Sequence, residues 1–86
     1  MALYFMHLRD GQDEVLDPEG TEQATLSALH AAVLRSARDV IKGDVDRGKI
    51  DFGYRIDAED ELGNIVHSLP FKLAVKIVPE QLTLDA

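Results

Sequence analysis

One long amphipathic segment, Thr21 to Lys42, most constrains what this chain can fold into. At about 100° per residue, its apolar side chains gather on one helical face, and its basic side chains gather on the opposite face. The apolar face consists of Leu26, Leu29, His30, Val33, Ala37, Val40 and Ile41, with Leu34 at the margin. Because such a face must be buried against another layer, we expect this helix to lie on a sheet.

The two ends of this helix carry signals of unequal strength. Thr21 is a suitable N-cap, and Glu22 would lie in the first turn, where the helix dipole favours negative charge. At the other end, Gly43 is followed by Asp44, which would return to the apolar face if the helix continued. The sequence therefore predicts an end near Gly43, with Gly48 as the alternative.

The segments on both sides of the helix have the composition of strands. Leu3 to Arg9 is rich in large apolar residues on both faces and ends in the turn signal Asp10-Gly11. Asp13 to Leu16 is a short second strand candidate, and the turn Asp17 to Gly20 follows it. The N-terminal region is thus predicted to form a strand or a hairpin.

A second hairpin is predicted after the helix. Its strands run from Gly53 to Ala58 and from Asn64 to Leu69, and the loop Glu59 to Gly63 joins them. Beyond it, Phe71 to Val78 has two interpretations. Strict alternation of apolar residues favours a strand, whereas the preceding proline and a spacing of three or four residues favour a short helix.

These elements predict an α+β fold in which one amphipathic helix packs on a small antiparallel sheet. The expected order is ββαββ, with a short C-terminal helix as a possible addition. Residues 1–78 are expected to form a single domain and residues 79–86 a flexible tail. The predicted core consists of Leu3, Phe5, Leu26, Leu29, Val33, Ala37, Val40, Ile41, Tyr54, Ile56, Ile65 and Leu69.

Composition narrows the classes of function. The chain has 86 residues, no cysteine and a net charge of −7, so a disulfide framework is excluded and phosphate neutralisation by Lys and Arg is disfavoured. A basic protein is a better match as a partner than DNA or RNA. The N-terminus lacks the basic region and long apolar stretch of a signal peptide, and no run of apolar residues is long enough to span a membrane. We therefore expect a cytoplasmic protein.

No constellation of residues has the spacing of a catalytic, cofactor or metal site. The histidines His7, His30 and His67 are far apart in the chain, and we expect structural roles for the first two and a solvent-facing position for His67. The acidic stretch from Asp57 fails as a calcium loop, because its sixth position is Leu62. Phosphate loops, nucleophile elbows and zinc-protease motifs are absent, so the sequence favours a protein that is not an enzyme.

The function that the sequence favours is a non-catalytic protein-interaction or regulatory module. Its best candidates for specific polar contacts are His7, Arg9 and Asp10 at the end of the first strand. Arg9 and Asp10 have an equally good structural interpretation, in which they stabilise the first turn. A small sheet with open edges and a first strand that is apolar on both faces also predicts self-association into a homo-oligomer.

Several short segments resemble a family of short alphaproteobacterial proteins of unknown function. They are Tyr4 to Gly11, Asp17 to Gly20, Ala37 to Asp39, Asp60 to Gly63 and Leu69 to Phe71. The likeness extends from Tyr4 to about Val78 and rests mainly on the aromatic-His-Leu-Arg-Asp-Gly opening. It implies a bacterial, cytoplasmic protein, supplies no activity, and implies a short helical turn after Phe71. The chain departs from the family at Met6, where an aromatic residue is usual, and at Gly43.

A second resemblance, in element order and composition alone, is to HicB-type antitoxins. These are small acidic proteins that open with antiparallel strands, a loop with proline and glycine, and then a helix. The resemblance implies an alternative function, in which an acidic surface covers and inhibits a basic RNA-cleaving toxin.

Overall fold

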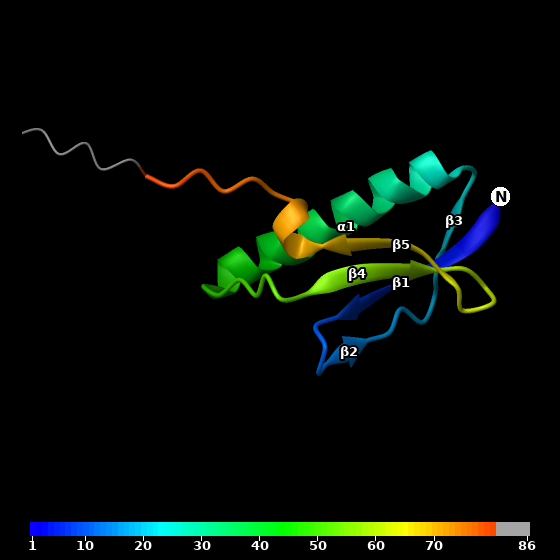
Figure 1. Cartoon of the computed structure of the whole chain (residues 1–86), viewed down its shortest axis with the longest axis horizontal. Coiled ribbons are helices and arrows are strands. Elements are labelled where there is room, and N and C mark those ends of the chain that lie inside the picture. Colours follow the sequence, from blue (N-terminus) through cyan, green and yellow to red (C-terminus); the bar gives the residue numbers. More distant parts are fainter. Residues whose placement is uncertain (81–86) are drawn as a thin grey trace, which may run out of the picture.

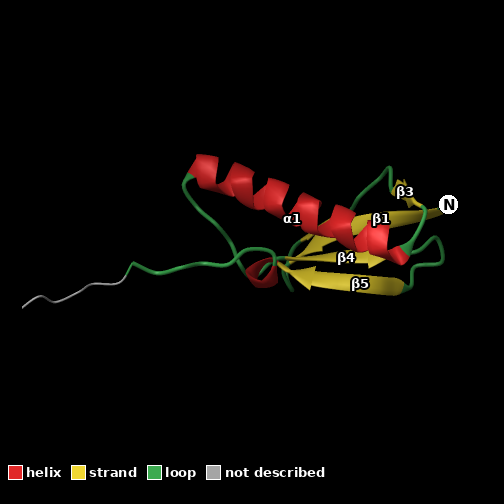
Figure 2. Ribbon diagram, turned by 90° about the horizontal axis from the view of Figure 1, so that it is seen from above, coloured by secondary structure: helices red, strands yellow, loops and turns green. Residues whose placement is uncertain are grey.

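A single helix, α1 (Leu26–Arg47), lies across one face of a five-stranded antiparallel sheet in the computed structural model, which describes residues 1–80 (Figure 1, Figure 2). The predicted α+β class is confirmed. The strands are β1 (Ala2–Arg9), β2 (Glu14–Val15), β3 (Thr21–Gln23), β4 (Arg55–Glu59) and β5 (Ile65–Pro70), and a 3-10 turn, η1 (Phe71–Leu73), follows. The strand order in the sheet is β2-β1-β4-β5, and β3 pairs with β1. The order along the chain is therefore βββαββ, with one strand more than predicted.

The additional strand, β3, occupies the segment predicted to start the helix. Its residues pair with the first residues of β1, Thr21 opposite Tyr4 and Gln23 opposite Ala2. The prediction of Thr21 as the N-cap is therefore wrong. Thr25 caps α1 instead, because its Oγ1 accepts a hydrogen bond from the Ala28 amide at 3.0 Å. Pairing with β1 satisfies backbone groups that a helix start would leave open, and this outweighs the local helix signals.

The helix ends at Gly48, the alternative terminus, and the predicted end near Gly43 is wrong. Gly48 has a φ of 83°, which favours glycine, and its amide bonds to the carbonyls of Asp44 and Val45. Ile41 is the last buried residue of α1, and Asp44 on the same side forms an ion pair with Arg47 at 2.7 Å. Within residues 1–80, no helix combines the length and hydropathy needed to cross a membrane.

The core lies between α1 and the face of β1, β4 and β5 that it covers. Five of the predicted core residues are buried, and they are Leu29, Val33, Ala37, Ile41 and Ile56. Val40, Tyr54 and Leu69 pack against them at the margin. The remaining buried apolar residues, Ala58, Phe71 and Ala74, were not predicted.

Four of the predicted core residues do not belong to the core. Leu3 and Phe5 lie on the far face of β1, because Met6 pairs with Ala58 and turns the even-numbered residues toward the helix. Leu26 is 53% exposed at the first turn of α1. Ile65 is 57% exposed, since a bulge at the hairpin end shifts the register and places it opposite Glu59.

The segment after β5 begins with a helical turn. Phe71 donates its amide to the Tyr54 carbonyl at 2.9 Å and is fully buried, so η1 closes one end of the core. The short helix among the two interpretations of residues 71–78 is thus confirmed for its first three residues, and the chain after residue 75 runs away from the body (Figure 1). Of the predicted tail, residues 81–86 lie outside the described residues.

Candidate functional site

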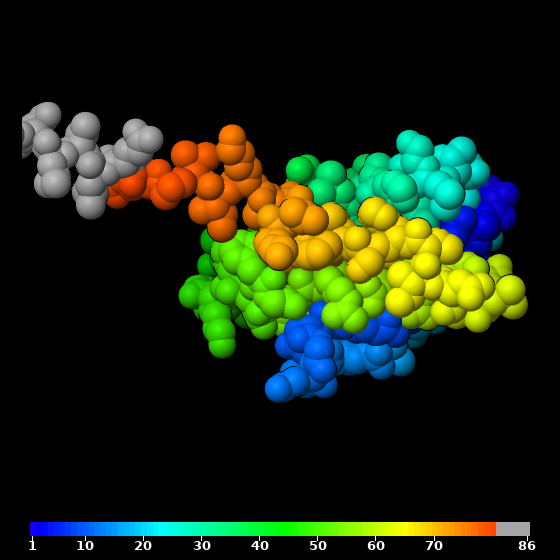
Figure 3. All heavy atoms as spheres, viewed as in Figure 1, coloured from blue at the N-terminus to red at the C-terminus, as the bar shows by residue number. Residues whose placement is uncertain are grey.

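The face of the sheet opposite α1 carries a network of charged side chains. Strand alternation places Arg55, Asp57 and Glu59 of β4 on this helix-free face, while Ile56 and Ala58 point to the core. The register sets Arg9 opposite Arg55 and His7 opposite Asp57. Figure 3 shows this face of the described residues, on which β1, β4 and β5 lie side by side without a second layer over them.

Asp57 lies at the centre of the network and is only 1% exposed. Its carboxylate accepts hydrogen bonds from Ser68 Oγ at 2.7 Å, Arg9 Nη1 at 3.0 Å and Arg55 Nε at 3.1 Å. Burial alone would raise the pKa of Asp57, but these hydrogen bonds outweigh it and hold the pKa below its ordinary value. The carboxylate is therefore charged at neutral pH.

Arg9 joins three carboxylates. Its Nε donates to Glu14 at 2.6 Å, and its Nη1 donates to Glu59 at 2.6 Å and to Asp57. The bonds to Glu14, Glu59 and Asp57, in that order of effect, raise the pKa of Arg9 above its ordinary value. Arg9 thus acts as a permanent positive charge that links β2, β1 and β4.

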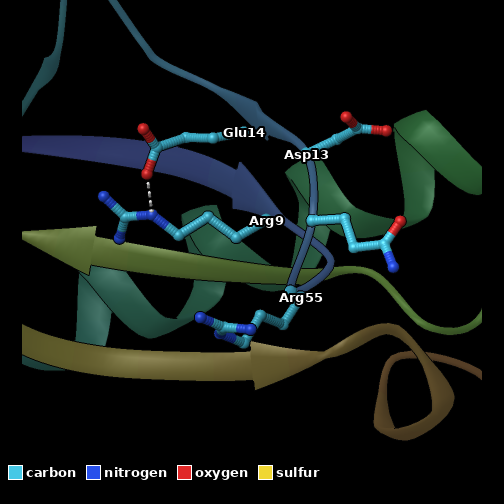
Figure 4. A pocket seen from close by; sticks show the side chains of 6 residues that line it. Arg9, Asp13, Glu14 and Arg55 are labelled. Atoms are coloured by element: carbon cyan, nitrogen blue, oxygen red, sulfur yellow. Dashed lines mark hydrogen bonds and ion pairs between the residues drawn. The ribbon is translucent and has the colours of Figure 1, made fainter.

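Arg55 is the more exposed of the two arginines. Its side chain is 40% exposed, and its terminal nitrogens make no hydrogen bond to any residue between 1 and 80. Beside it lies an open depression of about 290 Å³, which is lined by Arg9, Gly11, Gln12, Asp13, Glu14 and Arg55. In Figure 4 the two arginines extend in the same direction from neighbouring strands, and Glu14 faces Arg9.

His7 connects the network to the loop after β2. Its Nδ1 accepts the Asp17 amide at 3.1 Å, which assigns the ring proton to Nε2, and Nε2 lies 3.7 Å from Glu59 Oε1. Asp17 in turn accepts from the amides of Met6, Glu19 and Gly20. Burial opposes these bonds, yet together they hold the pKa of Asp17 below its ordinary value. His7 therefore has a structural role in holding this loop.

Asp10, the third residue of the sequence-based binding set, stands apart from the network. Its carboxylate accepts from the amides of Asp13 at 2.6 Å and Gln12 at 2.9 Å, and these bonds lower its pKa. Asp10 thus stabilises the turn between β1 and β2, whereas His7 and Arg9 both approach Glu59.

Most residues of the network were not predicted from the sequence. The sequence-based binding set did not include five members of the network, which are Arg55, Asp57, Glu59, Glu14 and Ser68. One signal was available, because charged residues at 55, 57 and 59 alternate with apolar residues at 56 and 58, a pattern typical of a strand with one charged face. Their convergence with Arg9 depends on strand register, which that pattern does not contain.

The two other histidines meet at the edge of the core, where His30 is exposed, so its predicted place on the buried face of the helix is wrong. The rings of His30 on α1 and His67 on β5 stack with centroids 3.9 Å apart. His67 is half-buried in this contact, so the prediction that it faces solvent is wrong. Burial, followed by the charge of His30, lowers the pKa of His67. No group of three or more His, Cys, Asp or Glu residues within residues 1–80 has an arrangement that would hold a metal ion.

Comparison with known proteins identifies a family without an assigned activity. The model of a domain of unknown function, DUF6894, matches residues 3–72, which is most of the chain. No curated protein matches the sequence, and no solved structure matches it either.

Proposed function

Because the chain belongs to the DUF6894 family, whose description names no activity, we propose from its structure that it is a non-catalytic protein-interaction module. The partner binds the helix-free face of the sheet, around Arg55. One observation carries the proposal: Arg9, Asp57 and Glu59 are held by short ion pairs on a face that no second layer of residues 1–80 covers. Charged groups held in place before binding lower the cost of ordering and give specificity for a partner of complementary charge.

The protonation states of the network support binding over acid-base catalysis. A general acid or base works best with a pKa near the operating pH. Here the pKa of Asp57 is lowered and that of Arg9 is raised, so both shifts move away from neutrality. The Ser68 hydroxyl donates a hydrogen bond to Asp57, and the Nδ1 of His7 accepts one from a backbone amide. Ser68 and His7 therefore do not form a nucleophile and base pair.

Arg55 is the residue assigned to direct contact with the partner. The side chains of His7 and Arg9 are 13% and 20% exposed, so they position the network, whereas Arg55 is more accessible. Its terminal nitrogens bond to no other described residue, so they suit a carboxylate or backbone carbonyl of the partner, and arginine is frequent among residues that dominate binding energy.

Affinity capture from native lysate with three versions of the full chain tests this function. We expect the unaltered chain and an Arg47→Gln control to retain the same protein, and Arg55→Gln to lose it. Arg47 has a 71% exposed side chain on α1, which makes it a matched control for loss of an arginine. Melting curves verify that both variants fold. Equal capture by all three chains would contradict the proposal, as would the absence of any specifically retained protein.

The proposal also includes a bacterial, cytoplasmic setting, which the family resemblance and the lack of cysteine support. Fractionation of a native bacterial host, with a tag on the chain, checks the compartment. Recovery in the periplasmic fraction would contradict it.

A HicB-like antitoxin function is the alternative, and the acidity of the first loops favours it. Residues 10–20 hold five carboxylates and no basic residue, and Asp13, Glu14 and Glu19 are exposed. Such a surface suits a basic toxin more than a nucleic acid. Co-expression with a small basic protein encoded beside this gene is the decisive test, since an antitoxin restores growth and an unrelated interaction module does not.

A further inference from the structure

An apolar groove lies on the helix side of the sheet, beside the edge strand β2. Its volume is about 300 Å³, and it is lined by Met6, Leu8, Val15, Leu16, Asp17, Ser36, Val40 and Ile56. Most of these side chains are apolar, and Val15 and Leu16 are 58% and 56% exposed beside the groove. The helix packs mainly on β3, β4 and β5 and forms only one wall of the groove through Ser36 and Val40, so apolar surface beside β2 remains in contact with water.

The same chain carries an apolar segment that its own core does not accommodate. After η1, the Ala74 carbonyl accepts a hydrogen bond from Arg38 Nε at 2.8 Å, and Val75 packs at the margin of the core. Beyond this anchor, Ile77 and Val78 are 66% and 76% exposed in an extended stretch that leaves the body (Figure 1). The described part of the chain thus contains a groove and an apolar segment, both unpartnered.

The segment cannot fill the groove of its own chain while it stays anchored. Ser36 and Val40 line the groove, and at about 100° per residue Arg38 lies about 200° from each, on the opposite flank of α1. Ile77 is three residues beyond Ala74, a reach of about 11 Å at most. This is no more than the width of the helix that it would have to cross.

Charge favours a second copy of the chain as the source of the segment. Lys76 directly precedes Ile77 and Glu80 lies four residues further on, whereas every charged residue from Asp10 to Gly20 beside the groove is acidic. Two chains of net charge −7 repel each other, and contact between Lys76 of one copy and the acidic loops of the other reduces that repulsion.

We propose that residues 76–80 of one copy dock in the apolar groove of a second copy, and that the exchange is reciprocal in a two-fold symmetric dimer. The extended segment runs along the outer edge of β2, whose backbone groups on that side face no strand among the described residues. Ile77 enters the groove, and Lys76 lies near the acidic loop. This interface is on the opposite side of the sheet from the face assigned to the partner protein, so either proposal can fail without the other.

Sedimentation velocity on the full chain at high micromolar concentration tests the dimer. We expect the unaltered chain to be dimeric, and Ile77→Asp or Leu16→Asp to weaken dimerisation by about 100-fold or more, because each homodimer loses two buried apolar contacts. Leu62→Asp is the control, since Leu62 is 87% exposed in the loop between β4 and β5. Both test positions are exposed in one copy, so the variant monomers should fold, which far-ultraviolet circular dichroism verifies. A monomeric unaltered chain, or a dimer that neither substitution affects, would overturn the proposal.

Mixing the two weakened variants distinguishes exchange between copies from docking within one chain. The Ile77→Asp chain keeps an intact groove, and the Leu16→Asp chain keeps an intact segment. The mixture should therefore contain heterodimers, whereas each variant alone should be mainly monomeric. The absence of cysteine allows a covalent check with Ile77→Cys and Leu16→Cys in differently tagged copies. A disulfide between the two tagged chains supports exchange. Failure to form it, or a disulfide within one doubly substituted chain, would overturn the proposal.

Discussion

Arg9 of β1 donates from Nη1 to Oδ2 of Asp57 on β4 at 3.0 Å, although 48 positions separate the two residues in the chain. The contact stabilises the pairing of β1 with β4 in this register. Arg9 lies directly opposite Arg55, and like charges in that position destabilise a sheet. Asp57 accepts from both guanidinium groups and compensates for their proximity.

Replacing Asp57 with Asn should therefore destabilise the fold. The substitution keeps the shape of the side chain but removes the charge that the two arginines share at a position only 1% exposed. We expect a loss of about 2–4 kcal/mol in the free energy of unfolding, measured by urea denaturation. Asp46→Asn, at an exposed position of α1, should change it by less than about 0.5 kcal/mol. Equal effects of the two substitutions would show that the network contributes no stability.

The stacked histidines predict a loss of stability in mild acid. Burial, followed by the charge of His30, lowers the pKa of His67 from its ordinary value of 6.5. The unfolded chain therefore binds a proton more readily than the folded one, and stability is lost as the pH falls from about 6.5 through the folded pKa. His67→Phe should abolish the part of this pH-dependent loss of stability that comes from His67, as measured by urea denaturation at a series of pH values. His30→Phe should only reduce it, because burial is the larger cause.

The loop after β2 predicts a position-specific effect of alanine. Gly20 and Gly63 both have positive φ, 75° and 86°, so alanine is strained at either position. At Gly20, however, a Cβ would also lie 3.0 Å from Leu3 Cδ1, Phe5 Cε1 and the Tyr4 carbonyl, whereas nothing lies within 4 Å at Gly63. Gly20→Ala should cost about 1–3 kcal/mol more than Gly63→Ala in thermal or chemical unfolding. Similar costs would mean that the loop moves away from β1 freely.

The packing of α1 predicts the outcome of a buried charge. Val33 is fully buried against the sheet, while Val45 on the same helix is 57% exposed. Val33→Asp should unfold the domain, because the carboxylate would have no partner in the core. Val45→Asp should leave the far-ultraviolet circular dichroism and the melting temperature nearly unchanged. If Val33→Asp also melts like the parent chain, the helix does not pack as described.

Part of the candidate site was visible in the sequence, and part required the fold. His7 and Arg9 were predicted as polar residues of the first strand, and both lie beside Glu59. Their chemistry was identified, but their partners were not, because Glu59 and Asp57 reach them only through the pairing of β1 with β4. Asp10 lies next to Arg9 in the chain, yet it turns to the backbone amides of the next turn.

The sequence by itself determined the α+β class, the buried stripe of α1 and the hairpin of β4 and β5. These follow from periods of 3.6 and 2 residues and from turn residues, all of which act within a few positions of one another. Only the tertiary structure decided that Thr21 to Gln23 form β3, that Met6 and Leu8 rather than Leu3 and Phe5 face the helix, and that Asp57 lies between two arginines. Each of these depends on which distant strand pairs with β1 and in which register, since a shift of one residue turns every side chain to the other face.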